Sequence, residues 1–338
     1  MKKVSLICPN AELAPQPVVI RPMLATLVDQ PFSDPDWLFE TKWDGIRAVC
    51  FLSNGKARFV SRNQNDLTAQ YPELASIGAS IKGKNAILDG EIVALDEQGI
   101  SRFQLLQPRM GRKNSSEIAR LASKTRVAYY VFDLLHLDGL VLTGCAVVDR
   151  KLALQSILKS SKNIRLSDHI VEHGKELYKE IVRVPLEGMI AKRLDSVYAQ
   201  RRSRDWLKIK TVLESEVVIG GYTEPRQSRS YFGALVVGLY DKGKLSYVGH
   251  AGGGFTDKTL AQIYKLLQPL KTTTSPFAEK VQTNEPVQWV KPKLVAQVKF
   301  AEWTADRRMR QPIFLGLRED KNPKECKFEV KRGTTEVV

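Results

Sequence analysis

The chain of 338 residues is long enough for two domains, and its 43% hydrophobic and 26% charged residues exclude a disordered chain. No apolar run reaches the ~18 residues of a membrane span, and the apolar stretch Val4–Cys8 stops at Pro9, too soon for a signal peptide, so we expect a soluble cytoplasmic protein with no membrane partner. Lysine and arginine (52) exceed aspartate and glutamate (37), and the net charge of +15 favours a polyanionic partner, because phosphates neutralised by these side chains release condensed counterions.

The first two thirds of the sequence predict an arm followed by a mixed domain. Residues 1–20 are punctuated by prolines and predict an arm over the surface, whereas residues 21–212 alternate β-rich segments with amphipathic helices. Runs of β-forming residues predict strands at Leu38–Lys42, Ile46–Leu52, Ala57–Ser61, Ala86–Leu95, Val127–Leu135, Gly188–Lys192 and Trp206–Lys210. A helical period predicts helices at Ser116–Ala122, Asp149–Leu158 and Lys175–Val184, the second with Leu152, Leu154, Ile157 and Leu158 as its apolar positions.

The remaining residues, 213–338, predict a second domain of a different kind. Short strands bounded by turn residues are expected at Val217–Tyr222, Gly233–Tyr240, Leu245–His250, Val295–Phe300 and Ile313–Leu317, with one amphipathic helix at Asp257–Leu267. Five strands and one helix in a segment of this size are typical of a small barrel of the OB type.

The hexapeptide Lys42–Arg47 (KWDGIR) joins two predicted strands. A lysine at the end of a strand, before a turn-forming Asp-Gly, presents its amine with little freedom. Such an amine becomes a covalent nucleophile when neighbouring cations or a metal lower its pKa. Asp-Gly is also typical of an ordinary hairpin turn. This segment alone therefore leaves both interpretations open.

Three later segments place charges within apolar strands. Leu88–Glu91 (LDGE) and Glu187–Lys192 (EGMIAK) each contain a carboxylate that requires a cation, a hydroxyl or a metal unless it faces water. In Trp206–Lys210 (WLKIK), alternation would direct Lys208 and Lys210 to one face, where they and the preceding arginines would form a phosphate clamp. A solvated basic strand is the alternative interpretation.

The order of these motifs is more informative than any one of them. KxDG, Ser61–Asn63 (SRN), DGE, Val131–Leu134 (VFDL), EGMIAK, WLKIK and a terminal RxDK follow one another along the chain. This succession resembles the covalent nucleotidyltransferase superfamily, specifically ATP-dependent DNA ligases, and most of all the ligase module of bacterial end-joining ligases of the ligase D type. The resemblance runs from about Pro22 to Lys321. It implies an α+β fold in which an adenylyltransferase (nucleotidyltransferase) domain, with ATP-grasp-like antiparallel sheets and flanking helices, precedes a C-terminal OB-fold β-barrel.

The resemblance also implies a role for each matching residue. Lys42 would attack the α-phosphate of ATP and carry AMP as a phosphoramidate, its pKa lowered by clustered cations. Glu187 would coordinate a divalent metal, Mg²⁺ or Mn²⁺. The other residues of the ATP site would be Glu40 and Phe132 at adenine, Glu91 at the ribose, Arg47 and Arg62 at the sugar and phosphates, Arg202 nearby, Lys208 and Lys210 at the α-phosphate, and Arg318, Asp320 and Lys321 at the departing pyrophosphate.

The implied activity is the sealing of 5′-phosphate/3′-hydroxyl nicks in duplex DNA through lysyl-AMP and a DNA-adenylate, in DNA repair or end joining. We expect a monomer associated with the bacterial nucleoid, with a Ku-like end-binding protein as a candidate partner. An RNA ligase and an mRNA-capping-type nucleotidyltransferase share the lysyl-nucleotide and are the alternative enzymes, and a DNA-binding scaffold is the non-enzymatic one. His169–His173 matches HxxEH, but a zinc site of that kind needs a helix, and the residues before it predict a strand.

Overall fold

The described residues form two compact units. The computed structural model describes residues 2–184, 186–211, 213–225 and 230–328. One unit ends at Thr211 and the other runs from residue 212 to 329, beside the expected domain boundary at 212/213. Among the described helices, none is long and apolar enough to cross a membrane.

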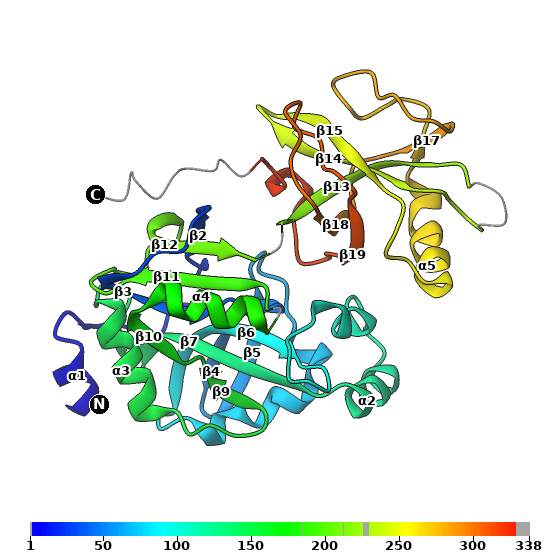
Figure 1. Cartoon of the computed structure of the whole chain (residues 1–338). Coiled ribbons are helices and arrows are strands. Elements are labelled where there is room, and N and C mark those ends of the chain that lie inside the picture. The colour runs from blue at the N-terminus through cyan, green and yellow to red at the C-terminus, as the bar shows by residue number, and fades with distance from the viewer. Residues whose placement is uncertain (1, 185, 212, 226–229, 329–338) are drawn as a thin grey trace. The chain divides into compact units, whose positions relative to one another are not determined.

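The N-terminal unit is built on two sheets with helices around them (Figure 1). Its strands are β1 (Glu12–Leu13), β2 (Leu24–Leu27), β3 (Asp34–Thr41), β4 (Ile46–Ser53), β5 (Lys56–Ser61), β6 (Asn85–Ala94), β7 (Val127–Leu137), β8 (Leu140–Val141), β9 (Ile164–Leu166), β10 (His169–Glu172), β11 (Gly188–Arg193) and β12 (Arg202–Lys210). Its α-helices are α1 (Lys2–Ile7), α2 (Ser115–Lys124), α3 (Val147–Ile157) and α4 (Gly174–Arg183).

The larger sheet has the order β1-β8-β7-β6-β4-β5, with β9 also on β7, and the smaller one has the order β10-β3-β11-β12-β2. Most neighbouring strands are antiparallel; β2 on β12 and β9 on β7 are parallel. β3 and β4 belong to different sheets. The KWDGIR segment is therefore a crossover between sheets, and the hairpin interpretation of its Asp-Gly is wrong.

Three apolar layers hold these sheets. One lies on the outer face of the larger sheet and includes Phe59, Tyr129 and Leu154. A second, including Phe132 and Trp206, lies between the two sheets. The third, including Phe39, covers the smaller sheet under α4 (Figure 1). Because β4, β6 and β7 have an apolar layer on each face, their sequences are almost continuously hydrophobic.

Three expectations about this unit need correction. The proline-punctuated start of the chain includes a short helix, α1, after which Cys8 is buried in the core because apolar side chains leave water wherever a partner surface exists. The single strand expected before His173 is two strands, β9 in the larger sheet and β10 in the smaller one. In α3, Leu152 is 49% exposed, whereas Arg150 and Lys151 are buried, because both cations meet buried carboxylates.

The C-terminal unit is a twisted antiparallel sheet with one α-helix. Its elements are β13 (Leu213–Thr223), β14 (Leu235–Asp241), β15 (Lys244–Ala251), α5 (Asp257–Leu267), β16 (Lys271–Thr272), β17 (Val287–Val290), β18 (Val295–Phe300) and β19 (Ile313–Leu317). The long β13 pairs with β14, β17 and β18. In the described part of this unit the ladders do not close into a complete barrel, although an isolated bridge joins Gly253 to Ile313.

A buried ion pair between β7 and α3 leads to the first prediction. Asp133 and Arg150 are both fully buried, and the guanidinium binds the carboxylate through Nε at 2.7 Å and Nη2 at 2.8 Å. Arg150→Met leaves the buried Asp133 carboxylate without its ionic partner. We therefore expect the free energy of unfolding, measured in urea, to fall by about 3–5 kcal/mol. Arg193→Met, which breaks an exposed pair with Asp195, should cost less than about 1 kcal/mol. Equal losses in the two variants would contradict a structural role for the buried pair.

Candidate active site

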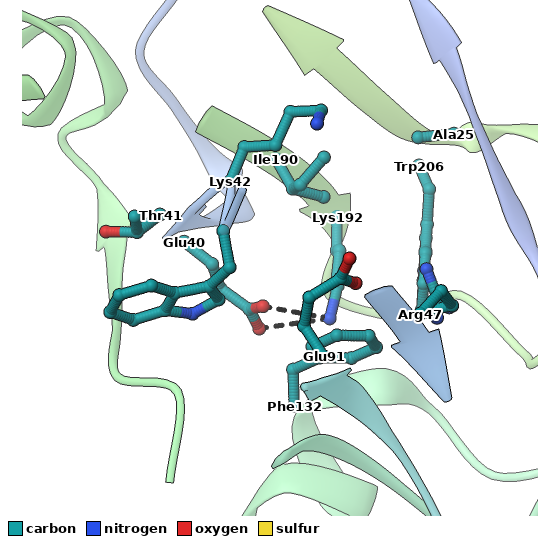
Figure 2. A pocket seen from close by; sticks show the side chains of 11 residues that line it. Ala25, Glu40, Thr41, Lys42, Arg47, Glu91, Phe132, Ile190, Lys192 and Trp206 are labelled. Atoms are coloured by element: carbon teal, nitrogen blue, oxygen red, sulfur yellow. Dashed lines mark hydrogen bonds and ion pairs between the residues drawn. The ribbon is translucent and has the colours of Figure 1, made fainter. Parts of the chain in front are cut away.

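A pocket opens between the two sheets of the N-terminal unit (Figure 2). It encloses about 510 Å³ when its open mouth is included. Its walls combine residues of β2, β3, β4, β6, β7, β11 and β12 with the segment after β3. The lining residues are Ala25, Glu40, Thr41, Lys42, Trp43, Arg47, Glu91, Phe132, Ile190, Lys192 and Trp206.

Strand alternation places the acidic residues of β6. Ile87 belongs to the layer between the sheets, and Asp89 and Glu91, two and four residues further on, share its face. Glu91 therefore lines the pocket and does not face open water as an edge-strand residue would. The same alternation on β12 packs Leu207 under α4 and leaves Trp206 on the pocket side.

Two glycines allow the backbone segments around Lys42 to pack closely. Lys42 N–H donates to the carbonyl of Gly188 at 2.9 Å, which joins the end of β3 to the start of β11. Gly188 has φ +151°, and a Cβ there would lie 2.1 Å from Ile209 O. A Cβ on Gly45 would lie 2.3 Å from Ile92 O. Both motifs therefore require glycine at these positions for close backbone packing.

Lys42 and Glu187 form an ion pair in this structure. Burial alone would lower the pKa of Lys42, but the field and hydrogen bond of Glu187 outweigh it, and the pKa is raised. The expectation that clustered cations lower this pKa is therefore wrong for the ligand-free protein. Burial raises the pKa of Glu187, and Lys42, Lys210 and Lys208 overcome that effect and lower it.

Glu40 lies at the inner end of the pocket in a cluster of buried charges. Lys192 Nζ is 3.1 Å from each Glu40 oxygen, the pair drawn with dashed lines in Figure 2. Lys151 of α3 also binds Glu40, at 2.5 Å from Oε1. Lys192 Nζ lies 4.6 Å from the ring centroid of Phe132 and 4.2 Å from that of Trp206, within cation–π range. Sequence reasoning assigned no role to either lysine.

Arg47 is held by a second buried carboxylate. Its Nε and Nη2 bind Asp89 at 2.7 and 2.6 Å, and its guanidinium carbon lies 4.5 Å from the Phe132 centroid. The Tyr198 hydroxyl donates to Asp89 and accepts the Met23 N–H at 3.0 Å. Asp89 and Tyr198 were also missed, although Asp89 stands in the quoted LDGE motif on the same strand face as Glu91.

The remaining cations expected in the nucleotide site have different positions. Lys208 and Lys210 lie on β12 near Glu187, whose pKa both lower. Arg202 begins β12, is exposed, and donates to the carbonyl of Ala25, a lining residue. Arg62, in the turn after β5, is not among the residues that line the pocket.

The terminal motif lies in the C-terminal unit. Arg318 binds Asp320 through Nε and Nη2, both at 2.8 Å, and Gln297 Oε1 at 2.7 Å. Lys321 pairs with Glu216 at 2.8 Å. Burial would raise the pKa of Asp320, but the Arg318 guanidinium outweighs it and lowers the pKa. Arg318 and Asp320 are thus a buried pair within their own unit.

Across the described ranges, no group of three or more His, Cys, Asp and Glu side chains could hold a metal ion. The HxxEH segment is the short strand β10 followed by α4, so its histidines are not one helical turn apart. A zinc site of that type is therefore absent from the described residues.

Residues 22–210 match the model of the ATP dependent DNA ligase domain, and residues 228–321 match that of the ATP dependent DNA ligase C terminal region. Because the first match alone covers more than half of the chain, the protein belongs to the family of ATP-dependent DNA ligases. The two matches correspond to a nucleotidyltransferase domain and a C-terminal OB-fold domain, as the sequence predicts.

Within that family the chain is similar to the LigD proteins. It is 38% identical over 94% of its length to the multifunctional non-homologous end joining protein LigD of Pseudomonas aeruginosa, and 37% identical over 93% to that of Mycolicibacterium smegmatis. It spans only 38% and 40% of the length of these relatives. The solved structure of mycobacterial DNA ligase D complexed with ATP and MES aligns with 93% of this chain and 98% of that one, at 33% identity and a TM-score of 0.66.

The buried Lys192 gives a test by pH. Burial, the largest cause, lowers the pKa of Lys192 from 10.5 to about 8 despite the attraction of Glu40. Between these two pH values the unfolded chain binds one more proton than the native state, so this lysine makes the unfolding free energy rise with pH. We expect the unfolding free energy of the wild type, relative to that of Lys192→Met, to rise across this range by up to about 1.4 kcal/mol per pH unit. A constant difference in urea titrations would contradict the lowered pKa.

Proposed function

We propose that this protein seals nicks in duplex DNA in three nucleotidyl-transfer steps. Lys42 Nζ attacks the α-phosphorus of ATP, and pyrophosphate leaves as the P–N bond of lysyl-AMP forms. The AMP then passes to the 5′-phosphate at the nick, which frees the lysine. Finally the 3′-hydroxyl attacks that 5′-phosphate and AMP departs. The observation that carries the proposal is the position of Lys42 on the wall of a pocket that also contains Glu40, Glu91 and Phe132.

The pocket chemistry supports a purine nucleotide as its ligand. Phe132 offers a ring for stacking, and the carboxylate of Glu40 accepts a hydrogen bond from the amino group of adenine. Glu91, which lines the same pocket, accepts from ribose hydroxyls. Together these three side chains supply a stacking surface and hydrogen-bond acceptors for the base and the ribose of adenosine.

Phosphoryl-type transfer depends mainly on positioning and charge neutralisation. Lys208 and Lys210, near Glu187, contact the α-phosphate. Arg47, which lines the pocket, contacts the sugar or the phosphates of AMP. Arg62 and Arg202 contact the sugar or the phosphates of AMP and the nick. We further propose that Arg318, Asp320 and Lys321 orient pyrophosphate when the C-terminal domain closes on ATP.

The ion pair with Glu187 imposes a condition on the first step. An ammonium cannot attack phosphorus, and the raised pKa means that Lys42 is protonated at neutral pH in the free protein. Lys42 must therefore separate from Glu187 and lose a proton when ATP binds. The mixed charge around Glu187, with Lys208 and Lys210 close by, offers that carboxylate other partners.

The residues present fit a divalent cation that binds together with the nucleotide. Mg²⁺ is commonly held by one or two carboxylates together with substrate phosphates, and Glu187 supplies one carboxylate beside the phosphate-binding lysines. When bound, Mg²⁺ or Mn²⁺ would neutralise charge on the phosphates. The scarcity of carboxylates fits an ion that does not bind tightly without ATP.

The wider setting follows from the relatives and from charge. The LigD proteins are named for non-homologous end joining, and we propose DNA repair by end joining as the role of this chain, with a Ku-like end-binding partner, association with the nucleoid and action as a monomer. The net charge of +15 supports contacts with the DNA backbone that have little sequence preference. An RNA ligase or a capping-type enzyme remains the alternative, which substrate competition between nicked DNA and nicked RNA distinguishes.

Lys42→Ala tests the nucleophile. With α-labelled ATP and Mg²⁺ we expect an acid-labile labelled band at 38.0 kDa in the wild type and none in the variant. Affinity for nicked DNA should change by less than about twofold, because one lysine contributes a small part of the electrostatic attraction. The variant should still seal a nick that already carries AMP, since the third step does not use the amine.

Lys175→Ala, on the exposed face of α4, is the matched control and should be labelled normally. Strong labelling of Lys42→Ala would place the nucleophile elsewhere. If the wild type gives no band, pyrophosphate treatment removes any AMP already attached, and the absence of labelling after that treatment would reject the ligase proposal.

Glu187→Gln tests the metal. By electron paramagnetic resonance, we expect Mn²⁺ to bind weakly to the free wild type and more tightly with a non-hydrolysable ATP analogue present. The variant should lower the nucleotide-dependent affinity about tenfold, equivalent to roughly 1.4 kcal/mol. Glu180→Gln, an exposed carboxylate of α4, should leave it unchanged. Equal Mn²⁺ affinity in wild type and Glu187→Gln would exclude Glu187 as a ligand.

A further inference from the structure

Lys151 lies behind the pocket and belongs to none of the motifs described in the sequence analysis. It belongs to α3, its side chain is 1% exposed, and it is not among the lining residues. Its ammonium has three hydrogens and three acceptors within reach: Glu40 Oε1 at 2.5 Å, Ser167 O at 3.2 Å and Phe132 O at 3.4 Å. Lys151 therefore ties Glu40 to the backbone of the strand that carries Phe132.

The two lysines leave the Glu40 carboxylate unequally occupied. Oε1 accepts from both Lys151 and Lys192, whereas Oε2 accepts from Lys192 at 3.1 Å. A carboxylate has about four lone-pair positions, so Oε2 retains capacity to accept another donor. Because Lys151 holds Oε1, the carboxylate cannot rotate freely, and Glu40, which lines the pocket, keeps a fixed oxygen with spare capacity to accept.

Lys192 alone would hold Glu40 less firmly. Its amine is shared with the Phe132 and Trp206 rings, and its contacts with the Glu40 oxygens, at 3.1 Å each, are longer than the 2.5 Å contact that Lys151 makes with Oε1. A buried carboxylate without a firm cationic partner would take up a proton or turn away. Lys151 is therefore the cation that holds the orientation of Glu40 most closely.

We propose that Lys151 is a positioning residue for base selection: by fixing Glu40 as an oriented acceptor, it makes the pocket select 6-aminopurine nucleoside triphosphates over purines without that amino group. This inference rests on the proposed function and adds a residue to it. A 6-amino group donates to the fixed carboxylate, whereas the 6-oxo group of guanine would place an acceptor against it and a 6-hydrogen would leave it unsatisfied.

The test compares self-nucleotidylation by ATP and by purine riboside 5′-triphosphate, which lacks only the 6-amino group, both α-labelled. The wild type should prefer ATP by about 10- to 100-fold in kcat/KM, the range for one hydrogen bond to a charged group. In Lys151→Met the preference should fall to about threefold or less, through a higher KM for ATP with kcat/KM for purine riboside triphosphate nearly unchanged. Gln155→Met, on the exposed side of α3, is the control and should keep the full preference.

A purely structural role predicts a different result. If Lys151 only supports packing, Lys151→Met lowers kcat/KM for both nucleotides by the same factor and leaves the preference intact, and this outcome would overturn the inference. If the wild type takes no label from ATP at all, after pyrophosphate treatment, the proposed function has failed and not the assignment of Lys151 alone.

A double-mutant cycle keeps the test valid if Lys151→Met does not fold. Glu40→Gln/Lys151→Met removes the buried charge together with its partner, and its selection is compared with that of Glu40→Gln. If Lys151 acts through Glu40, the two variants select equally. A further change in selection on removing Lys151 when the carboxylate is already gone would show that Lys151 acts by another route.

Discussion

The N-terminal unit depends on pairing charges that it has buried between and behind its two sheets. Asp133 meets Arg150, Asp89 meets Arg47, and Glu40 meets two lysines, with each of these three carboxylates at most 2% exposed. An unpaired charge in such a place would cost several kcal/mol. Each pair therefore fixes the spacing of two different elements, and Glu40 and Arg47, which belong to two of these pairs, line the pocket.

The two sheets contribute different residues to the pocket. The smaller sheet supplies Glu40 from β3, Lys192 from β11 and Trp206 from β12, and the larger sheet supplies Arg47, Glu91 and Phe132. Neither sheet contains a complete site. Because Lys151 of α3 binds both Glu40 on β3 and the carbonyl of Phe132 on β7, a charged contact joins the two halves in addition to apolar packing, which is less directional.

The sequence predicts the parts of this arrangement that follow from strand periodicity. Alternation is enough to place Glu91 with Asp89 and Trp206 with Lys208, and the order of motifs is enough to indicate the ligase family. The same reasoning fails in α3, where a helical period favours Leu152 as core over Arg150 and Lys151. Hydrophobicity cannot show that a cation is buried when its partner carboxylate lies on another strand, more than a hundred residues away for Lys151 and Glu40.

The pKa of Lys42 is another property that the sequence alone does not predict. Counting nearby cations suggests a lowered pKa, because the motifs around it contain several lysines and arginines. The fold instead places Glu187 against its amine, since Gly188 lets β11 begin close beside the end of β3, and a single carboxylate in contact outweighs cations further away. In the reaction we propose, ATP would add more negative charge to this site and hold the ammonium still more firmly. Transfer from Lys42 would then begin only when positive charges around Glu187 and the phosphates compensate both anions, so the proposal gives Lys208 and Lys210 a part in the chemistry as well as in binding.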